Sequence, residues 1–271
     1  MNVKRDGGDV RTRESLPTSS SWKTLPRRAL MRVRTGRRLW WRGRRRSEVD
    51  FWAGWLAGVP GTEQWADDRE ARLKPETEIR DPVVRAELDR NPADEVGILD
   101  VGAGPLTWLG YRYHGKKLTI VPVDPLAADY DRLLQDVGLE PPVRTISVAG
   151  EDLLEHFEPA SFDIAYATNA LDHSADPLTI ISNMLAVVRP GGVVILRHKR
   201  NEGQSARYSG LHQWNFDAVD GGLLLWNEAT EVDVGAAFAE HAETTAWLEE
   251  HEVVARLVVR ATHGAPVEPS L

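Results

Sequence analysis

The chain alternates short apolar runs with longer amphipathic segments from residue 96 to residue 259. The apolar runs, expected to be strands, cover residues 96–101, 118–123, 143–148, 162–167, 193–197, 223–226 and 253–259. The amphipathic segments, expected to be helices, cover residues 126–137, 177–188 and 234–250, and another helix is expected to start at Pro105. This alternation is typical of a parallel sheet with helices on both faces. We therefore predict an α/β fold with a seven-stranded, mostly parallel sheet.

Segments of different character flank these strands and suggest three regions. Residues 1–46 form a basic arm, expected to be disordered or associated with a surface. Residues 47–92 form a helical cap, with an aromatic face on a helix over 47–59 and polar helices near 62–74 and 81–90. Residues 93–271 form the main domain, with a polar and aromatic loop inserted at about 201–222.

Charge is divided unevenly along the chain. The net charge is -8, yet residues 1–50 contain 15 Lys and Arg against 5 Asp and Glu. Such an arm can contact an anionic membrane surface weakly, but it can equally be a solvated tail or an artefact of an upstream start codon. Nucleic-acid binding is not expected, because no recognised nucleic-acid-binding fold accompanies the charge. The charge pattern says nothing about the oligomeric state.

The composition excludes several other classes of protein. The chain has no cysteine, which excludes disulfides and cysteine-ligated metal sites. No apolar stretch approaches the roughly 20 residues that span a bilayer, and the basic start lacks the apolar segment of a secretory signal. We expect a cytoplasmic protein, peripheral to the membrane if the arm binds there.

A glycine turn follows the first predicted strand and is the main candidate for a ligand site. The run Asp100-Val-Gly102-Ala103-Gly104 removes two side chains where the backbone must bend and a ligand can come close. A dinucleotide site would need a third glycine in Gly-x-Gly-x-x-Gly, and none stands at that place. Asp124 ends the second strand, 20 residues after Gly104, where an acid can accept hydrogen bonds from both hydroxyls of a ribose or else cap a helix.

Polar residues also follow the later strands. Glu151 and Asp152 come after the third strand, where either acid can contact a ligand or cap a helix. Asn169, Asp172 and His173 come after the fourth. His173 can take a proton from a substrate hydroxyl or merely fix its loop. A metal site is not predicted, because an adjacent Asp-His pair lacks further ligands at a suitable spacing.

The Asp100–Gly104 run, together with Arg189-Pro-Gly-Gly192 before the fifth strand, resembles class I S-adenosylmethionine-dependent methyltransferases, although Leu106 replaces the family's usual third glycine. The resemblance covers roughly residues 95–200 and implies a Rossmann-like sheet that binds S-adenosylmethionine. In such enzymes a helix before the first strand often covers the site, which makes Phe51 and Trp55 candidate lid residues. The implied cofactor-binding residues are Asp100, Gly102, Ala103, Gly104, Asp124, Glu151, Asp152 and Asn169.

The function predicted from this resemblance is O-methylation of a hydroxylated small molecule, sugar or glycan. The candidate catalytic bases are His173 and then His198 and His212, which lie after the fifth strand among polar and aromatic residues suited to a hydroxylated substrate. Two alternatives remain, a non-catalytic S-adenosylmethionine-binding or scaffold protein and a nicotinamide-dependent oxidoreductase.

Overall fold

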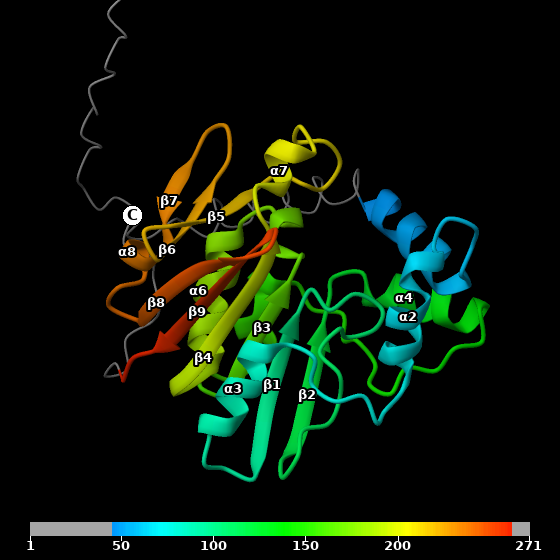
Figure 1. Ribbon diagram of the computed structural model, residues 1–271, viewed down its shortest axis with the longest axis horizontal. Coiled ribbons are helices and arrows are strands. Elements are labelled where there is room, and N and C mark those ends of the chain that lie inside the picture. The colour runs from blue at the N-terminus through cyan, green and yellow to red at the C-terminus, as the bar shows by residue number, and fades with distance from the viewer. Residues whose placement is uncertain (1–44, 262–271) are drawn as a thin grey trace, which may run out of the picture.

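Six strands form the central sheet of the computed structural model, which describes residues 45–261. Their order is β2 (Lys117–Val123), β1 (Glu95–Val101), β3 (Phe162–Thr168), β4 (Val188–Lys199), β9 (Glu252–Val259) and β8 (Ala242–Glu249) (Figure 1). The first four strands are parallel, and β9 and β8 are antiparallel to their neighbours. The predicted mostly parallel α/β sheet is confirmed, with six strands in place of seven.

Alternate residues of the central strands point to opposite faces of the sheet, and each face is covered by a helix. On one face, Leu99 and Ala165 join a core that includes α6 (Pro177–Val187). On the other face, Ile98 and Ile164 pack with α3 (Pro82–Arg90). Because both faces are covered, the strands are apolar almost throughout, which is why they were recognisable in the sequence.

Two predicted strands lie outside the central sheet. Residues 143–148 make only a single bridge, between Ile146 and Val123. Pro141 and Pro142 precede them without backbone donors, and the Thr145 hydroxyl turns away to donate to the Gly104 carbonyl at 2.8 Å. The predicted strand over 223–226 is β6 (Gly222–Trp226), which lies in a separate three-stranded sheet between β5 (Asn215–Val219) and β7 (Glu231–Asp233).

The predicted helix over 234–250 is wrong. Only α8 (Val234–Ala237) is helical, and β8 follows it. The β-branched Thr244 and Thr245 favour a strand, and β8 pairs along its whole length with β9 across a tight turn in which Glu250 has a φ of 52°. Pairing with an apolar neighbour outweighs the helix propensity of the alanine and glutamate residues in this segment.

The predicted helix from Pro105 is also wrong. The residues after the glycine turn form a loop that bonds to the segment before α3, with Tyr111 donating its amide proton to Thr77 and Ile79 donating to Arg112. The two segments approach so closely that a Cβ on Gly110, whose φ is 88°, would lie 2.3 Å from the Glu78 carbonyl oxygen. Cross-segment pairing therefore replaces the intrahelical hydrogen bonds expected here.

The helices predicted over 47–59, 62–74 and 81–90 are present, but the last of them, α3, packs on one face of the central sheet. A helix covers residues 45–57, followed by η1 (Glu63–Trp65) and α2 (Ala66–Leu73), and they lie beside α4 (Ala127–Asp136) (Figure 1). Trp55 and Leu56 pack with Leu106 and Leu134 in a separate small core. Residues 1–44 of the predicted basic arm lie outside the described residues, so its membrane contact and the cytoplasmic location stay predictions. No helix within 45–261 is long and apolar enough to cross a membrane.

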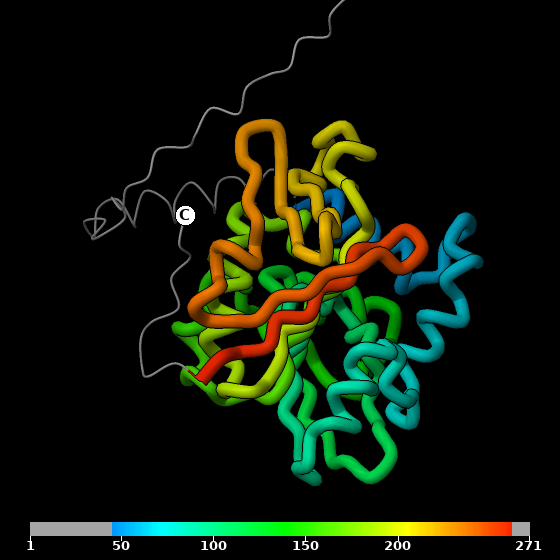
Figure 2. Tube along the Cα trace, turned by 60° about the vertical axis from the view of Figure 1, so that its left-hand side comes forward, coloured from blue at the N-terminus to red at the C-terminus, as the bar shows by residue number. Residues whose placement is uncertain are grey.

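The segment predicted as a loop insertion at about 201–222 is partly ordered. It begins with α7 (Glu202–Ser205), passes through an irregular stretch and enters β5. In Figure 2 these residues and the small sheet stand together at one end of the central sheet, the end where the parallel strands finish. The insertion therefore lies at the same end of the sheet as the glycine turn.

A buried ion-pair network joins α3 to β4 and the β8–β9 hairpin. The Arg197 Nε lies 2.8 Å from the Asp81 carboxylate, which is fully buried and also accepts the Val83 and Val84 amide protons at the start of α3. The same guanidinium reaches Glu249 at 2.8 Å and Glu252 at 3.0 Å. One side chain thus connects three elements that are distant in sequence.

Candidate functional site

A pocket opens at the carboxyl edge of the parallel strands, as expected for ligand sites in open α/β sheets. It holds about 570 Å³ of empty space, its open mouth included. Its walls bring together Gly102, Gly104, Asp124, Glu151, Asn169 and His173 from the sequence prediction. Ala103, Asp152, His198 and His212 are not among the lining residues, nor is Asp100.

The glycine turn forms the floor of the pocket, and its shape depends on the missing side chains. Gly102 has a φ of 74°, and a Cβ there would lie 2.3 Å from the Cβ of Ala170. Its amide and that of Ala103 both donate to the Val123 carbonyl, which ties the turn to β2. A bare backbone is therefore presented to whatever occupies the pocket.

Asp100 lies behind the turn, fully buried. Its Oδ2 accepts a hydrogen bond of 2.5 Å from the Thr107 hydroxyl, which fixes the loop that follows the turn. Burial raises the pKa of Asp100 to about 6, against the opposing effects of Thr107 and Arg72. Its position suits shaping the turn, and its direct contact with a cofactor stays a prediction.

Asp124 faces the pocket from the end of β2. Its oxygens accept amide protons from Leu126 at 2.8 Å and Gly104 at 3.2 Å, so it holds both the segment that leads into α4 and the glycine turn. A carboxylate has further lone pairs that can accept from two adjacent hydroxyls. Burial raises the pKa of Asp124 to about 7, and the nearby Glu48 adds to this shift.

The raised pKa of Asp124 predicts a specific effect of pH on stability. An acid whose pKa is higher in the folded state than its ordinary value of 3.8 makes folding less favourable as pH rises from about 4 through about 7. The free energy of unfolding of wild type should therefore fall relative to Asp124→Asn, by on the order of 4 kcal/mol between pH 4 and pH 8. Urea denaturation of both proteins across this range measures the difference, and a difference independent of pH contradicts the prediction.

The helix over 45–57 covers the pocket, but with residues other than those predicted. Phe51 is 46% exposed and Trp55 is buried in the small core. Trp52 instead lies over the turn, with its ring 2.9 Å from the place of a Cβ on Gly104, and its Nε1 donates to Glu48 at 2.8 Å. Glu48 and Trp52 are four residues apart on one helix face, a spacing that the sequence contained and the prediction overlooked.

The candidates after the third and fourth predicted strands differ in placement. Glu151 lines the pocket from η2 (Gly150–Asp152), while Asp152 lies outside its walls. Asn169 lines the pocket with a φ of 45° and accepts the Lys199 amide proton at 2.8 Å. It therefore links the ends of β3 and β4 at the pocket wall.

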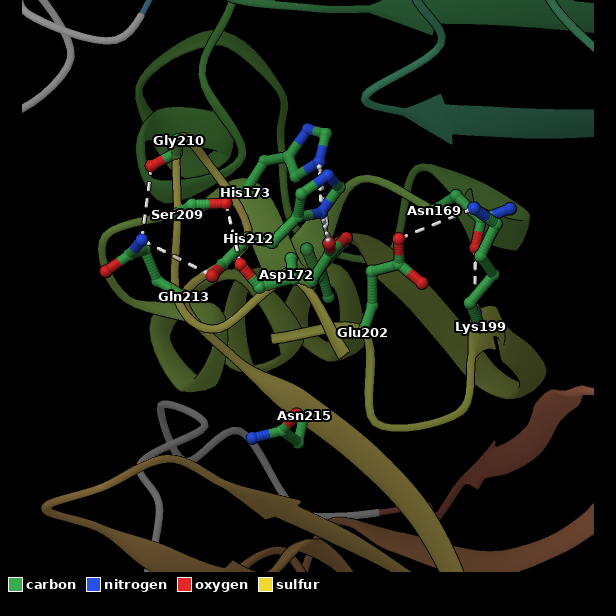
Figure 3. A network of polar contacts seen from close by, with 12 residues as sticks. Asn169, Asp172, His173, Lys199, Glu202, Ser209, Gly210, His212, Gln213 and Asn215 are labelled. Atoms are coloured by element: carbon green, nitrogen blue, oxygen red, sulfur yellow. Dashed lines mark hydrogen bonds and ion pairs between the residues drawn. The ribbon is translucent and has the colours of Figure 1, made fainter. Parts of the chain in front are cut away.

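Two predicted bases meet in a cluster with Asp172 (Figure 3), and one of them, His173, lines the pocket. Asp172 and His173 belong to η3 (Leu171–His173), and His212 reaches them from the insertion. Burial alone would raise the pKa of Asp172, but the neighbouring histidines His173 and His212 hold it below its ordinary value. The hydrogen bond that the Asp172 carboxylate accepts from His212 in turn raises the pKa of His212.

His198 occupies a different environment. It is 1% exposed, and its ring stacks on Phe216 with centroids 4.2 Å apart. Burial lowers the pKa of His198 to about 4, so the ring is neutral at physiological pH. His198 does not line the pocket, so its role as a base stays a prediction.

Comparison with known proteins identifies the fold that carries this pocket. Residues 99–196 match the family described as a methyltransferase domain. No curated protein matches the chain. The chain is similar to an rRNA methyltransferase of T. thermophilus solved with AdoMet and guanosine, at 14% identity over 69% of this chain and 41% of that one (TM-score 0.37).

Two further solved structures are similar over comparable lengths. One is the CurJ carbon methyltransferase, at 14% identity over 66% of this chain and 52% of that one (TM-score 0.47). The other is the Burkholderia thailandensis 1,6-didemethyltoxoflavin-N1-methyltransferase with S-adenosylhomocysteine bound, at 18% identity over 80% and 89% (TM-score 0.40). The chain therefore spans about half or less of the first two proteins.

The matched segment contains the glycine turn, Asp124 and the strands that frame the pocket. It runs from Leu99 in β1 to Leu196 in β4. The bare turn and the inward carboxylate of Asp124 fit the amino-acid end and the ribose of S-adenosylmethionine. Within this segment the chain is therefore similar to a methyltransferase domain.

Proposed function

We propose that this chain is an S-adenosylmethionine-dependent methyltransferase that acts on an oxygen atom of a hydroxylated small molecule, sugar or glycan. The observation that carries the proposal is the Asp172–His173–His212 cluster, because a hydroxyl must lose its proton on methylation and His173 of this cluster lines the pocket. A carbon or nitrogen acceptor that is already nucleophilic needs no such group.

In this proposal, some residues of the pocket bind S-adenosylmethionine and others promote removal of the acceptor's proton. S-adenosylmethionine supplies an electrophilic methyl group on its sulfonium. Gly102 and Gly104 leave space for its amino-acid end, Asp124 accepts from the ribose hydroxyls, and Glu151 lies on the adenine side. Trp52 covers the turn and excludes water, while His173 faces the acceptor's side.

The test combines an acceptor screen with a histidine variant. Release of S-adenosylhomocysteine is measured with hydroxylated acceptors and with nitrogen and carbon acceptors of similar size. With the best hydroxylated acceptor, His173→Ala should lower kcat by about 10²- to 10⁴-fold, the contribution typical of a group that assists proton transfer. The Kd for S-adenosylmethionine should change little, because the proposed cofactor contacts are made by other residues.

The matched control is His156→Ala, an exposed histidine on α5 (Leu153–His156), which should retain full turnover. Turnover confined to nitrogen or carbon acceptors contradicts the proposal. So does unchanged kcat of His173→Ala on an oxygen acceptor.

A further inference from the structure

Three side-chain atoms form a tight triangle next to the pocket, which one of their residues, His173, lines (Figure 3). Nδ1 of His212 lies 2.8 Å from Oδ2 of Asp172 and 3.0 Å from Nε2 of His173. The third side, from Nε2 of His173 to Oδ2 of Asp172, measures 3.4 Å. The three atoms come from two segments about 40 residues apart, so this grouping exists only in the folded chain.

Hydrogen bonding alone accounts poorly for this triangle. An imidazole nitrogen carries either a proton or a lone pair. If Nδ1 of His212 donates to the Asp172 carboxylate, the 3.0 Å contact between the two ring nitrogens either shares that proton or places two N–H groups against each other. The second carboxylate oxygen, Oδ1 of Asp172, is buried without a hydrogen-bond partner among the described residues, and Asp172 is only 4% exposed.

A cation would satisfy all of these atoms. Ligands held about 2.1 Å from a metal ion are separated by about 3.0 Å at right angles and about 3.4 Å in a tetrahedron. The observed sides of 2.8, 3.0 and 3.4 Å agree with this range. Two imidazoles and one carboxylate on one side of an ion are a familiar ligand set that leaves positions open on the other side.

The surroundings support the ligand set. Glu48 places Oε2 3.7 Å from Nδ1 of His173, the ring nitrogen opposite the triangle, where a carboxylate orients a metal-binding histidine. The Gln213 amide donates to the Asp172 carbonyl at 2.9 Å, which ties the His212 segment to η3. His198, neutral at physiological pH, adds no positive charge nearby.

We propose that Asp172, His173 and His212 bind a divalent first-row transition-metal ion whose open positions face the methyl acceptor. The ion site itself stands on the geometry alone, whereas its role in catalysis rests on the proposed oxygen acceptor. The acceptor hydroxyl would bind the ion through oxygen, and its proton would pass to a solvent water because the ion lowers the hydroxyl pKa. An oxygen lone pair then forms the O–CH3 bond as the S–CH3 bond breaks, leaving neutral S-adenosylhomocysteine. The imidazoles thus promote proton loss through the ion.

Metal binding is measured on the full chain without any acceptor. The protein is stripped with a chelator and titrated with Co²⁺, followed by visible absorption, and with Zn²⁺ by calorimetry. We expect one ion per chain, with a Kd at least 100-fold weaker for His212→Ala and for Asp172→Asn, since a ligand should matter at least as much as the groups that orient it. Glu48→Gln should weaken binding by about 10-fold.

The control variant is His114→Ala, an exposed histidine that should leave metal binding unchanged. Unchanged S-adenosylmethionine affinity of His212→Ala shows that this variant is folded. Absence of binding to the stripped wild type, or equal binding by wild type and both ligand variants, overturns the proposal. Metal binding by an enzyme that methylates only nitrogen or carbon would refute the proposed oxygen acceptor and leave the ion site standing.

Discussion

Arg197→Met should lower the free energy of unfolding by about 3–5 kcal/mol, because it leaves the fully buried Asp81 carboxylate without its charged partner. The substitution also removes the ion pairs of Arg197 with Glu249 and Glu252, which connect the β8–β9 hairpin to β4. Methionine keeps most of the apolar length of the arginine side chain, so lost packing contributes little. Denaturation with guanidinium chloride, monitored by circular dichroism, measures the loss.

A matched exposed pair separates burial from the mere presence of an ion pair. Arg200 binds Asp217 at 2.7 Å but its side chain is 47% exposed, so Arg200→Met should cost at most about 1 kcal/mol. Adding Asp81→Asn to Arg197→Met should recover part of the loss, since asparagine removes the buried charge and still caps α3. Equal losses from the two arginine variants would show that burial of Asp81 is not the cause.

Gly102→Ala should destabilise the protein by about 3 kcal/mol or more and weaken S-adenosylmethionine binding at least 10-fold. A residue other than glycine at a φ of 74° costs about 1–2 kcal/mol, and the overlap of its Cβ with Ala170 adds about 1–3 kcal/mol. The turn can relieve that overlap only by moving, and this movement displaces the backbone on which the cofactor is proposed to lie. Chemical denaturation and calorimetric titration measure the two effects.

Gly115→Ala provides the control for backbone strain. Gly115 has a similar φ of 71°, but a Cβ there meets nothing within 4 Å. This variant should therefore lose only about 1–2 kcal/mol and bind the cofactor normally. If Gly102→Ala and Gly115→Ala behave alike, the close approach to Ala170 does not constrain the turn.

Local sequence was sufficient to predict the glycine turn and the carboxylate that line the pocket. The strand before Gly102 is apolar because both sheet faces are covered, and Asp124 stands directly at the end of β2. Both features are readable within a few residues of the chain. Their placement at one pocket wall then follows from the parallel pairing of β1 and β2.

The errors arose where long-range pairing outweighs local preference. The loop after Pro105 bonds to Thr77, and β8 pairs with β9, so neither segment forms its expected helix. The contact between His173 and His212 joins residues 39 positions apart through a folded insertion. No spacing rule reaches that far, which is why the sequence indicated an isolated Asp-His pair without a third ligand.

The cover formed by Trp52 has a kinetic consequence. Its ring lies against the glycine turn, on a helix that belongs to neither the central sheet nor the insertion. A cofactor that enters or leaves past this ring requires the helix to move, so the opening rate of the helix sets a common ceiling on association and dissociation along that path. Loosening the helix would then speed both steps together and leave their ratio, the equilibrium affinity, nearly constant.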